Sequence, residues 1–318
     1  MCEFSLKFQE DKAVWDDFLS RSPQRSIFLN SKFLDSLEIY YDLVTCYSKD
    51  KIVAGVSILH SNSGEAFQAP FHFTQYQGLL LSENTHKNNH SGITQNFRIT
   101  EYFIKSLAER YKNFNLCNSW RLNDLRAFQW FNYHETTKNK FKIDLRYTGL
   151  LDLTKFTDFE YYLKTIRAVR RQEFNKSSEL IFEFSDDISA LDILHQKTFD
   201  RQNIKRNITD SKLLKSITKA SLINGYGKLG IVYLNKNPIS ASLFLYDDRT
   251  AYYLFGANDP EYRRTGSGTF LMINMIKDAM QKDILEVDFC GANSPNRGDY
   301  KISFNAELKN YFICTYNE

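Results

Sequence analysis

The sequence has few cysteines, little excess charge and no long hydrophobic run, and each shortage excludes a class of protein. Its five cysteines are scattered and none belongs to a C-x-x-C pair, so neither a disulfide framework nor a structural zinc site is indicated. Scattered cysteines without a pairing pattern are typical of proteins in a reducing compartment, and we expect a cytoplasmic protein. No run of about 18 apolar residues occurs, so we expect no membrane-spanning helix. The charged residues 1–11 lack an apolar core, so we expect no signal peptide.

The charge balance lies close to neutrality. The net charge of +3 over 318 residues is too small for a dedicated nucleic-acid binder, which concentrates a larger basic excess. Hydrophobic residues make up 42% and charged residues 25%, values that allow a chain of this length to bury a core in each of two ordinary domains.

The order of predicted elements repeats once along the chain. In residues 53–117 and again in 231–290, a strand hairpin precedes a helix and the helix precedes a short strand. We therefore predict two α/β modules, 1–145 and 146–318, each a mixed, mainly antiparallel sheet flanked by helices. The expected helices are 12–19, 31–41, 97–111, 159–176, 190–201, 212–224 and 269–281, with a polar loop at 82–92. The expected strands are 43–47, 52–60, 114–117, 141–151, 229–234, 239–246, 251–256 and 284–289.

The segment 252–291 is the most informative part of the sequence. It contains an apolar strand, an arginine-glycine loop, an amphipathic helix and a second apolar strand, and the loop reads RRTGSG from Arg263 to Gly268. Glycines at the start of a helix let the backbone approach a ligand, and the free N–H groups of the first turn favour an anion. The pattern predicts a pyrophosphate site. The alternative is an ordinary polar loop with a glycine N-cap.

Several motifs resemble one protein family. The spacing of Arg263, Gly266 and Gly268 resembles the Arg-x-x-Gly-x-Gly acyl-CoA loop of the GNAT N-acyltransferase superfamily. Residues 287–291 (VDFCG) and 300–304 (YKISF) resemble the C-terminal signature of its FemABX-like, acetyltransferase-6 type double-domain branch. Residues 124–128 (DLRAF) and 167–171 (RAVRR) are also similar to that branch.

This resemblance implies a donor site and a catalytic lysine. Acetyl-CoA or another acyl-CoA would be the co-substrate, bound by Arg263, Arg264, Gly266, Ser267 and Gly268. The ammonium of Lys301 would stabilise the oxyanion that forms as an amine attacks the acyl carbon. Alternatively, Lys301 is a surface lysine whose stem packs on neighbouring aromatic rings.

Other polar residues have both a functional and a structural interpretation. Asp288 would accept the proton of the incoming amine, or would only hydrogen-bond the backbone at the end of its strand. The basic residues Lys164, Arg167, Arg170 and Arg171 are spaced by three or four along one predicted helix. They would contact a phosphorylated acceptor or an RNA backbone, or form a solvated helix face.

Two further groups concern the acceptor and metals. Trp130, within the aromatic segment 128–133, would line an acceptor pocket or pack in a core. His86 and His90 are four residues apart, but they lie in a segment rich in asparagine that offers no acidic ligand, so we expect no metal site.

The expected activity is transfer of an acyl group, acetyl first of all, from CoA to a primary amine. The resemblance implies a small-molecule acceptor such as an amino acid or an amino sugar, nucleotide-linked or free, destined for a cell-envelope polymer. The first module, which has lost the loop, would form the acceptor side. One alternative is an aminoacyl-tRNA-dependent FemABX-type peptidyltransferase, although the sequence contains no heptad-patterned arm. Another is a non-catalytic binding or scaffold protein. The oligomeric state is not predicted.

Overall fold

The computed structural model describes residues 4–83 and 88–318, which form two compact units. The first unit contains Met1–Arg146 and Asn310–Glu318, and the second contains Tyr147–Lys309. Strands β6 (Lys142–Asp152) and β12 (Glu307–Asn317) each begin in one unit and end in the other. The last nine residues belong to the first unit because β12 pairs antiparallel with β5 (Asn113–Asn118).

The first unit is built on an antiparallel sheet of order β1-β2-β3-β4, beside the β5-β12 pair. Its core gathers the inward side chains of the central hairpin, such as Val44 and Val56, with Phe103 and Leu107 of the long helix α3. The strands are β1 (Ser5–Phe8), β2 (Tyr40–Ser48), β3 (Lys51–His60) and β4 (Leu80–Leu81). The helices are α1 (Lys12–Arg21), η1 (Ile27–Leu29), α2 (Ser31–Asp35), α3 (Asn89–Tyr111) and α4 (Arg126–Trp130).

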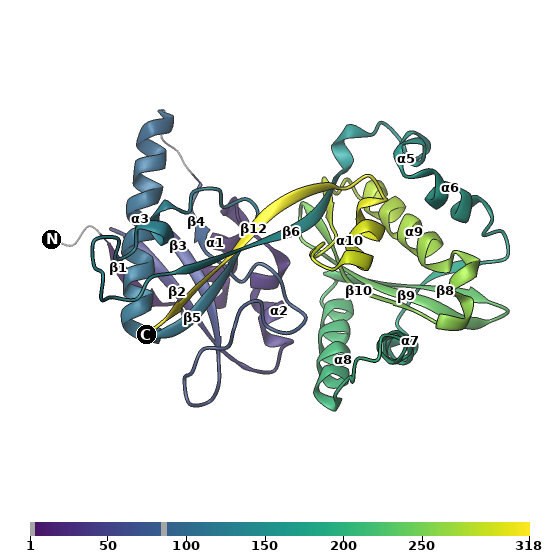
Figure 1. Cartoon of the computed structure of the whole chain (residues 1–318), viewed down its shortest axis with the longest axis horizontal. Helices are drawn as coiled ribbons and strands as arrows, with labels where there is room; N and C mark the ends of the chain where they lie inside the picture. The colour runs from purple at the N-terminus through teal and green to yellow at the C-terminus, as the bar shows by residue number, and fades with distance from the viewer. Residues whose placement is uncertain (1–3, 84–87) are drawn as a thin grey trace. The chain divides into compact units, whose positions relative to one another are not determined.

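The second unit has a sheet of order β6-β11-β10-β9-β8-β7, in which only the β10-β11 pair is parallel. Helices α7 and α8 cover one face, and α5, α6 and α9 cover the other (Figure 1). The strands are β7 (Ile181–Ser185), β8 (Gly227–Leu234), β9 (Asn237–Tyr246), β10 (Thr250–Asn258) and β11 (Glu286–Asp288). The helices are η2 (Leu153–Lys155), α5 (Phe159–Thr165), α6 (Ala168–Asn175), α7 (Ile188–Arg201), α8 (Ile208–Ile223), η3 (Pro260–Thr265), α9 (Ser267–Gln281) and α10 (Pro295–Ile302).

Helix α9 is the centre of the second core. Its apolar side chains, among them Ile273 and Ile276, are fully buried against Phe244 and Val287 of the sheet and Phe304 beyond α10. Each such side chain stabilises the fold by roughly 1.5–3 kcal/mol relative to leaving it exposed. The start of α9 is therefore fixed relative to the sheet. The predicted fold class, mixed α/β with mainly antiparallel sheets flanked by helices, is confirmed.

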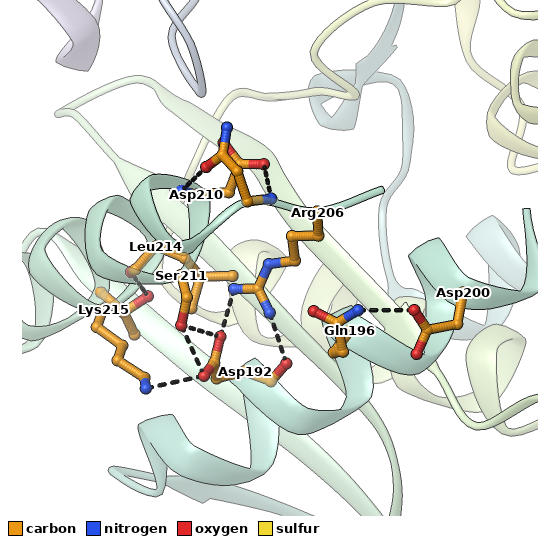
Figure 2. A network of polar contacts seen from close by, with 10 residues as sticks. Asp192, Gln196, Asp200, Arg206, Asp210, Ser211, Leu214 and Lys215 are labelled. Atoms are coloured by element: carbon orange, nitrogen blue, oxygen red, sulfur yellow. Dashed lines mark hydrogen bonds and ion pairs between the residues drawn. The ribbon is translucent and has the colours of Figure 1, made fainter. Parts of the chain in front are cut away.

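On the other face, Asp192 of α7 forms a buried ion pair with Arg206, which lies in the segment between α7 and α8 (Figure 2). Arg206 bonds the Asp192 carboxylate and, at 3.0 Å, its carbonyl oxygen, and its side chain is only 2% exposed. Asp192 also accepts from Ser211 Oγ at 2.9 Å and from Lys215 Nζ at 2.8 Å. Burial opposes the charged form of Asp192, but the hydrogen bonds from Lys215, Arg206 and Ser211 hold its pKa below the usual value.

The predicted helix 159–176 is wrong in one respect, because it is interrupted at Ile166 and Arg167. Both residues have extended ψ values, 159° and 137°, and the Arg167 N–H donates to the Ser303 carbonyl at 3.0 Å. Ile166 is buried. This long-range contact overrides the local helical preference and separates α5 from α6, so the four basic residues do not share one helix face.

Three further boundaries differ from the prediction. The helix expected at 31–41 ends at Asp35, because the chain reverses at Glu38 with φ of 55° and Tyr40 begins β2. Residues 89–92 of the expected polar loop are helical in α3, while 84–87 lie outside the described residues. The expected turn at 300–304 begins as the last turn of α10, a helix that starts with Pro295.

Candidate functional site

The site predicted for the donor lies where β10 and β11 part. The two parallel strands pair only from Thr250 and Glu286 to Tyr252 and Asp288, after which β11 ends. Strand β10 continues to Asn258 and pairs with β9 alone, with an irregular register after Tyr253. The chain then forms η3 and enters α9.

Gly266 is the N-cap of α9 and has a left-handed φ of +76°. A side chain here would be strained, and its Cβ would lie 3.1 Å from Cβ of Glu173 on α6. Glycine is therefore needed both for the turn and for the close approach of α6. Because the first turn of a helix leaves N–H groups without intrahelical partners, this position presents donors to an anion.

The side chains of the next residues face the protein. Ser267 is buried, and its Oγ lies 2.7 Å from Oγ of Ser240, which in turn lies 2.5 Å from Asn258 Oδ1. A Cβ on Gly268 would lie 2.8 Å from the same Asn258 oxygen. Ser267 and Gly268 can therefore offer a ligand their backbone only. Their packing against β10 and β9 gives them a structural role as well.

The two arginines of the loop are exposed. Arg263 and Arg264 form the last turn of η3, immediately before Gly266. Within the described ranges, neither guanidinium forms an ion pair with a carboxylate. Both are available to bind an anion placed at the start of α9.

Lys301 is held by the backbone of the turn that follows β11. Its Nζ donates to the carbonyl oxygens of Phe289 at 2.6 Å and Gly291 at 2.8 Å, with Cys290 O at 3.4 Å, and lies 5.5 Å from the centre of the Tyr253 ring. Burial lowers the pKa of Lys301 to about 8. The lysine is half-buried, and its ammonium holds the turn that follows β11. Its role in the reaction stays a prediction.

Asp288 supports the same turn from its other side. The side chain is fully buried, and Oδ1 accepts from Thr148 Oγ1 at 2.6 Å and from the Cys290 N–H at 2.8 Å. Cys290 and Gly291 have left-handed φ values of 52° and 91°. Asp288 thus makes the backbone contact that the structural interpretation expected, and its role as proton acceptor stays a prediction.

The low pKa of Lys301 predicts a pH-dependent contribution to stability. Burial places the pKa at about 8, whereas a lysine in an unfolded chain titrates near 10. Between these values the unfolded chain binds more protons, so the free energy of unfolding of the wild type should rise with pH relative to Lys301→Met. The free energy of unfolding is measured with urea at about pH 7.5 and about pH 9.5 for both proteins. Its increase between the two pH values should be larger in the wild type than in Lys301→Met, by on the order of 2 kcal/mol. Equal changes with pH in the two proteins would contradict this contribution of Lys301.

The three arginines proposed for the acceptor are engaged within the second unit. Arg167 makes two hydrogen bonds to Asp299, at 2.7 and 2.8 Å. Arg170 bonds Glu173 at 2.5 Å and Thr269 Oγ1 at 2.9 Å. The remaining one, Arg171, bonds the carbonyl oxygens of Lys164 and Ile166.

No sequence motif indicated the contacts of Glu173 and Thr269. Thr269 Oγ1 donates to Glu173 at 2.5 Å, and Arg170 stacks 5.0 Å above the Tyr300 ring. Through these contacts Arg170 and Glu173 of α6 hold Thr269, in the first turn of α9, against α6. Tyr253 was missed as well: its ring packs on Phe289, and no sequence motif marks it.

The remaining expectations concern the first unit and metals. Trp130 is 50% exposed in α4 and packs on Phe97, while its neighbour Phe128 is buried in the core. Among the described residues no cluster of three His, Cys, Asp or Glu could hold a metal ion, and His86 lies outside them. In the described ranges, every helix is too short or too polar to cross a bilayer.

Residues 162–301 match the family model of an acetyltransferase (GNAT) domain. No curated protein sequence matches the chain.

Solved structures extend the likeness to both units. The crystal structure of FemX matches with a TM-score of 0.69 at 12% identity, over 97% of this chain and 96% of that one. A tandem GNAT protein from the clavulanic acid biosynthesis pathway matches with a TM-score of 0.54 at 11% identity, over 98% of both chains. The C-terminal domain of a putative lysylphosphatidylglycerol synthetase from Agrobacterium fabrum matches with a TM-score of 0.58 at 11% identity, over 96% of this chain and 92% of that one. At these identities the likeness establishes the fold.

Proposed function

Because this chain carries an acetyltransferase (GNAT) domain within a FemABX-like double GNAT fold, we propose that it transfers an acyl group, acetyl first of all, from acyl-CoA to a primary amine. The observation that carries the proposal is the start of α9. A left-handed Gly266, the N–H groups of the first turn and the exposed Arg263 and Arg264 come together there. The Ser267 N–H already donates to Thr265 Oγ1 at 3.3 Å, so the residues after it supply the donors for an anion. A pyrophosphate is the anion that such a site suits.

The proposed reaction is direct attack by the amine on the thioester carbonyl. The new C–N bond forms a tetrahedral oxyanion, the C–S bond then breaks, and CoA leaves as the thiolate while the amine loses a proton. The chain must orient the donor, stabilise the oxyanion and accept that proton. In this proposal Lys301 stabilises the oxyanion. Its ammonium is held in position by the carbonyl oxygens of the turn after β11, and Asp288 bonds the backbone of the same turn.

The acceptor is proposed to be a small amine, with an amino sugar or an amino acid of a cell-envelope precursor as the first class to screen. The first unit, 1–145 in the sequence-based division, would supply the acceptor side, with the exposed Trp130 as a stacking surface. Each of these roles is proposed by analogy with the fold.

Calorimetric titration with CoA and acetyl-CoA tests the donor. Saturable binding with a Kd in the range of about 1–100 μM is expected. No binding by the folded protein would overturn the proposal and would direct attention to aminoacyl-tRNA as the donor.

A charge reversal sharpens this test. Arg264→Glu places a carboxylate beside the proposed phosphates and should weaken CoA binding by about tenfold or more. The matched control is Lys219→Glu, an exposed residue of α8 with the same change of charge. Replacement of Gly268 is a poorer test, because a side chain there meets Asn258 and disturbs the fold itself. Equal CoA affinity of both variants would remove Arg264 from the donor site.

A further inference from the structure

We propose that Arg201 and Arg297, beside Arg263 at the edge of the donor loop, form a second anion site in the second unit, which binds a phosphate group of the acyl acceptor. The inference rests on the proposed acyl transfer and gives its acceptor a chemical class, a phosphorylated amine. None of the residues first considered for the acceptor, Arg167, Arg170 and Arg171, is part of it.

The three arginines come from separate elements that meet at one corner. Arg201 is the last residue of α7, Arg263 lies in η3 and Arg297 lies in the first turn of α10. Helix α7 is attached to the end of β10, because Thr198 Oγ1 accepts from the Asn258 N–H at 3.1 Å. The next residue of the chain, Asp259, which precedes η3, binds Lys197 Nζ at 2.5 Å. These contacts bring the last turn of α7 beside Arg263.

Helix α10 reaches the same corner through a side-chain hydrogen bond. A guanidinium nitrogen of Arg297 donates to Oε1 of Gln202, the residue that follows Arg201. Gln202 is itself fixed, because its Nε2 donates to the Thr198 carbonyl oxygen at 2.9 Å. Arg297 is therefore held beside the C-terminus of α7.

The positive charges at this corner act on one another. The pKa of Arg201 is lowered, first by burial and then by the positive charges of Arg263 and Arg297. Nearby carboxylates are directed elsewhere: Asp200 accepts from Gln196 at 2.7 Å, and Asp259 binds Lys197.

In the described part of the chain, none of the three arginines forms an ion pair with a carboxylate. Arg167, Arg170 and Arg206 of the same unit are all paired with acids. Three like charges held together without a counter-charge repel one another, and a bound anion relieves that repulsion. Three guanidinium forks suit the several oxygens of a phosphate better than a single carboxylate.

The position of Arg297 favours the acceptor as the source of the phosphate. Its charge acts on Lys301, whose pKa it helps to lower, and on Tyr253, where burial raises the pKa to about 12 and Arg297 opposes the rise. Arg297 also precedes Lys301 by four residues, one turn of α10. The cluster thus lies on the Lys301 side of the donor loop, where an acceptor has to place its amine.

The test uses the full chain and inorganic phosphate as the probe. Wild-type protein is first saturated with CoA, which occupies the donor loop, and is then titrated with phosphate by calorimetry. Binding is expected, and Arg201→Gln and Arg297→Gln are each expected to weaken it about tenfold. Lys219→Gln is the control for loss of one positive charge. Unchanged circular dichroism of each variant shows that it has folded.

Affinities for CoA and dephospho-CoA separate the two sources of phosphate. If the acceptor supplies it, Arg201→Gln and Arg297→Gln bind both nucleotides within about twofold of the wild type. Weaker binding of CoA but not of dephospho-CoA would overturn the acceptor assignment and give the cluster to the 3′-phosphate of the donor. Absence of phosphate binding to the CoA-saturated wild type, or equal binding by the variants, would also overturn it. Failure of the protein to bind CoA at all would reject the proposed function instead, and phosphate binding lost in both variants would then still support the anion site.

Discussion

Replacement of Lys301 with methionine is expected to lower kcat by about 100-fold or more, since loss of a fixed positive charge beside a developing oxyanion costs that much. Methionine keeps the length of the stem and removes the ammonium, which also leaves the carbonyl oxygens of Phe289 and Gly291 without their donor. Affinity for CoA should change by less than about threefold, because the donor loop lies in η3 and the first turn of α9. Steady-state kinetics with acetyl-CoA and an amine from the screen measure the first effect, and calorimetry measures the second.

The control for this variant is Lys301→Arg. Arginine keeps the positive charge, but its planar guanidinium cannot reproduce the geometry of one nitrogen among three carbonyl oxygens. Recovery of most of the rate in Lys301→Arg would show that the charge is what matters, and low rates in both would show that the turn after β11 must be held. A Lys301→Met protein with wild-type kcat would exclude the lysine from the mechanism.

Replacement of Asp192 with alanine is expected to lower the free energy of unfolding by about 3–5 kcal/mol, because it leaves the buried Arg206 charge unpaired. The same change removes the acceptor of Ser211 and Lys215 (Figure 2). For a unit of this size the melting temperature should fall by about 10 °C. Urea and thermal unfolding, followed by circular dichroism, measure the effect.

Acid provides an internal control for Asp192. Its pKa is held below the usual value, so the stabilisation is present above the pKa of an unfolded aspartate, near 4, and is lost as pH falls through the lower folded value. The difference between wild type and Asp192→Ala should therefore shrink in strong acid. Asp200→Ala, on the same helix, should cost far less, because the exposed Asp200 carboxylate accepts from the side chain of Gln196 and pairs with no buried charge. Equal stabilities of Asp192→Ala and wild type would contradict the importance of the pair.

The repeating order of elements and the family resemblance were enough to predict the fold class, and the glycine loop led to a proposed place for the donor site. Apolar periodicity located the hairpin of β8 and β9 and the helix α9, because their buried faces are continuous in sequence. The break between α5 and α6 was not predictable, since it depends on a hydrogen bond from Arg167 to Ser303 that spans the unit. Local sequence carries no information about such a partner.

In the site, too, some features follow from local sequence and others depend on tertiary packing. A glycine before a helix indicated Gly266, and the family resemblance indicated Lys301, because both rest on local patterns of sequence. The partners of Lys301 are local too, but the inward direction of their carbonyl groups depends on left-handed residues at Cys290 and Gly291 that sequence did not indicate. The meeting of Arg201 with Arg263 and Arg297 depends on how three elements pack, and it is visible only in the structure.

The exchange of strands between the units affects the order in which the chain folds during synthesis. Domains made first usually fold first on the ribosome. Here the first unit has to wait, because β5 gains its partner β12 only when the final nine residues emerge. Until then the edge of β5 is open to pairing with other chains, and removal of the C-terminus would damage the half of the protein that was made first.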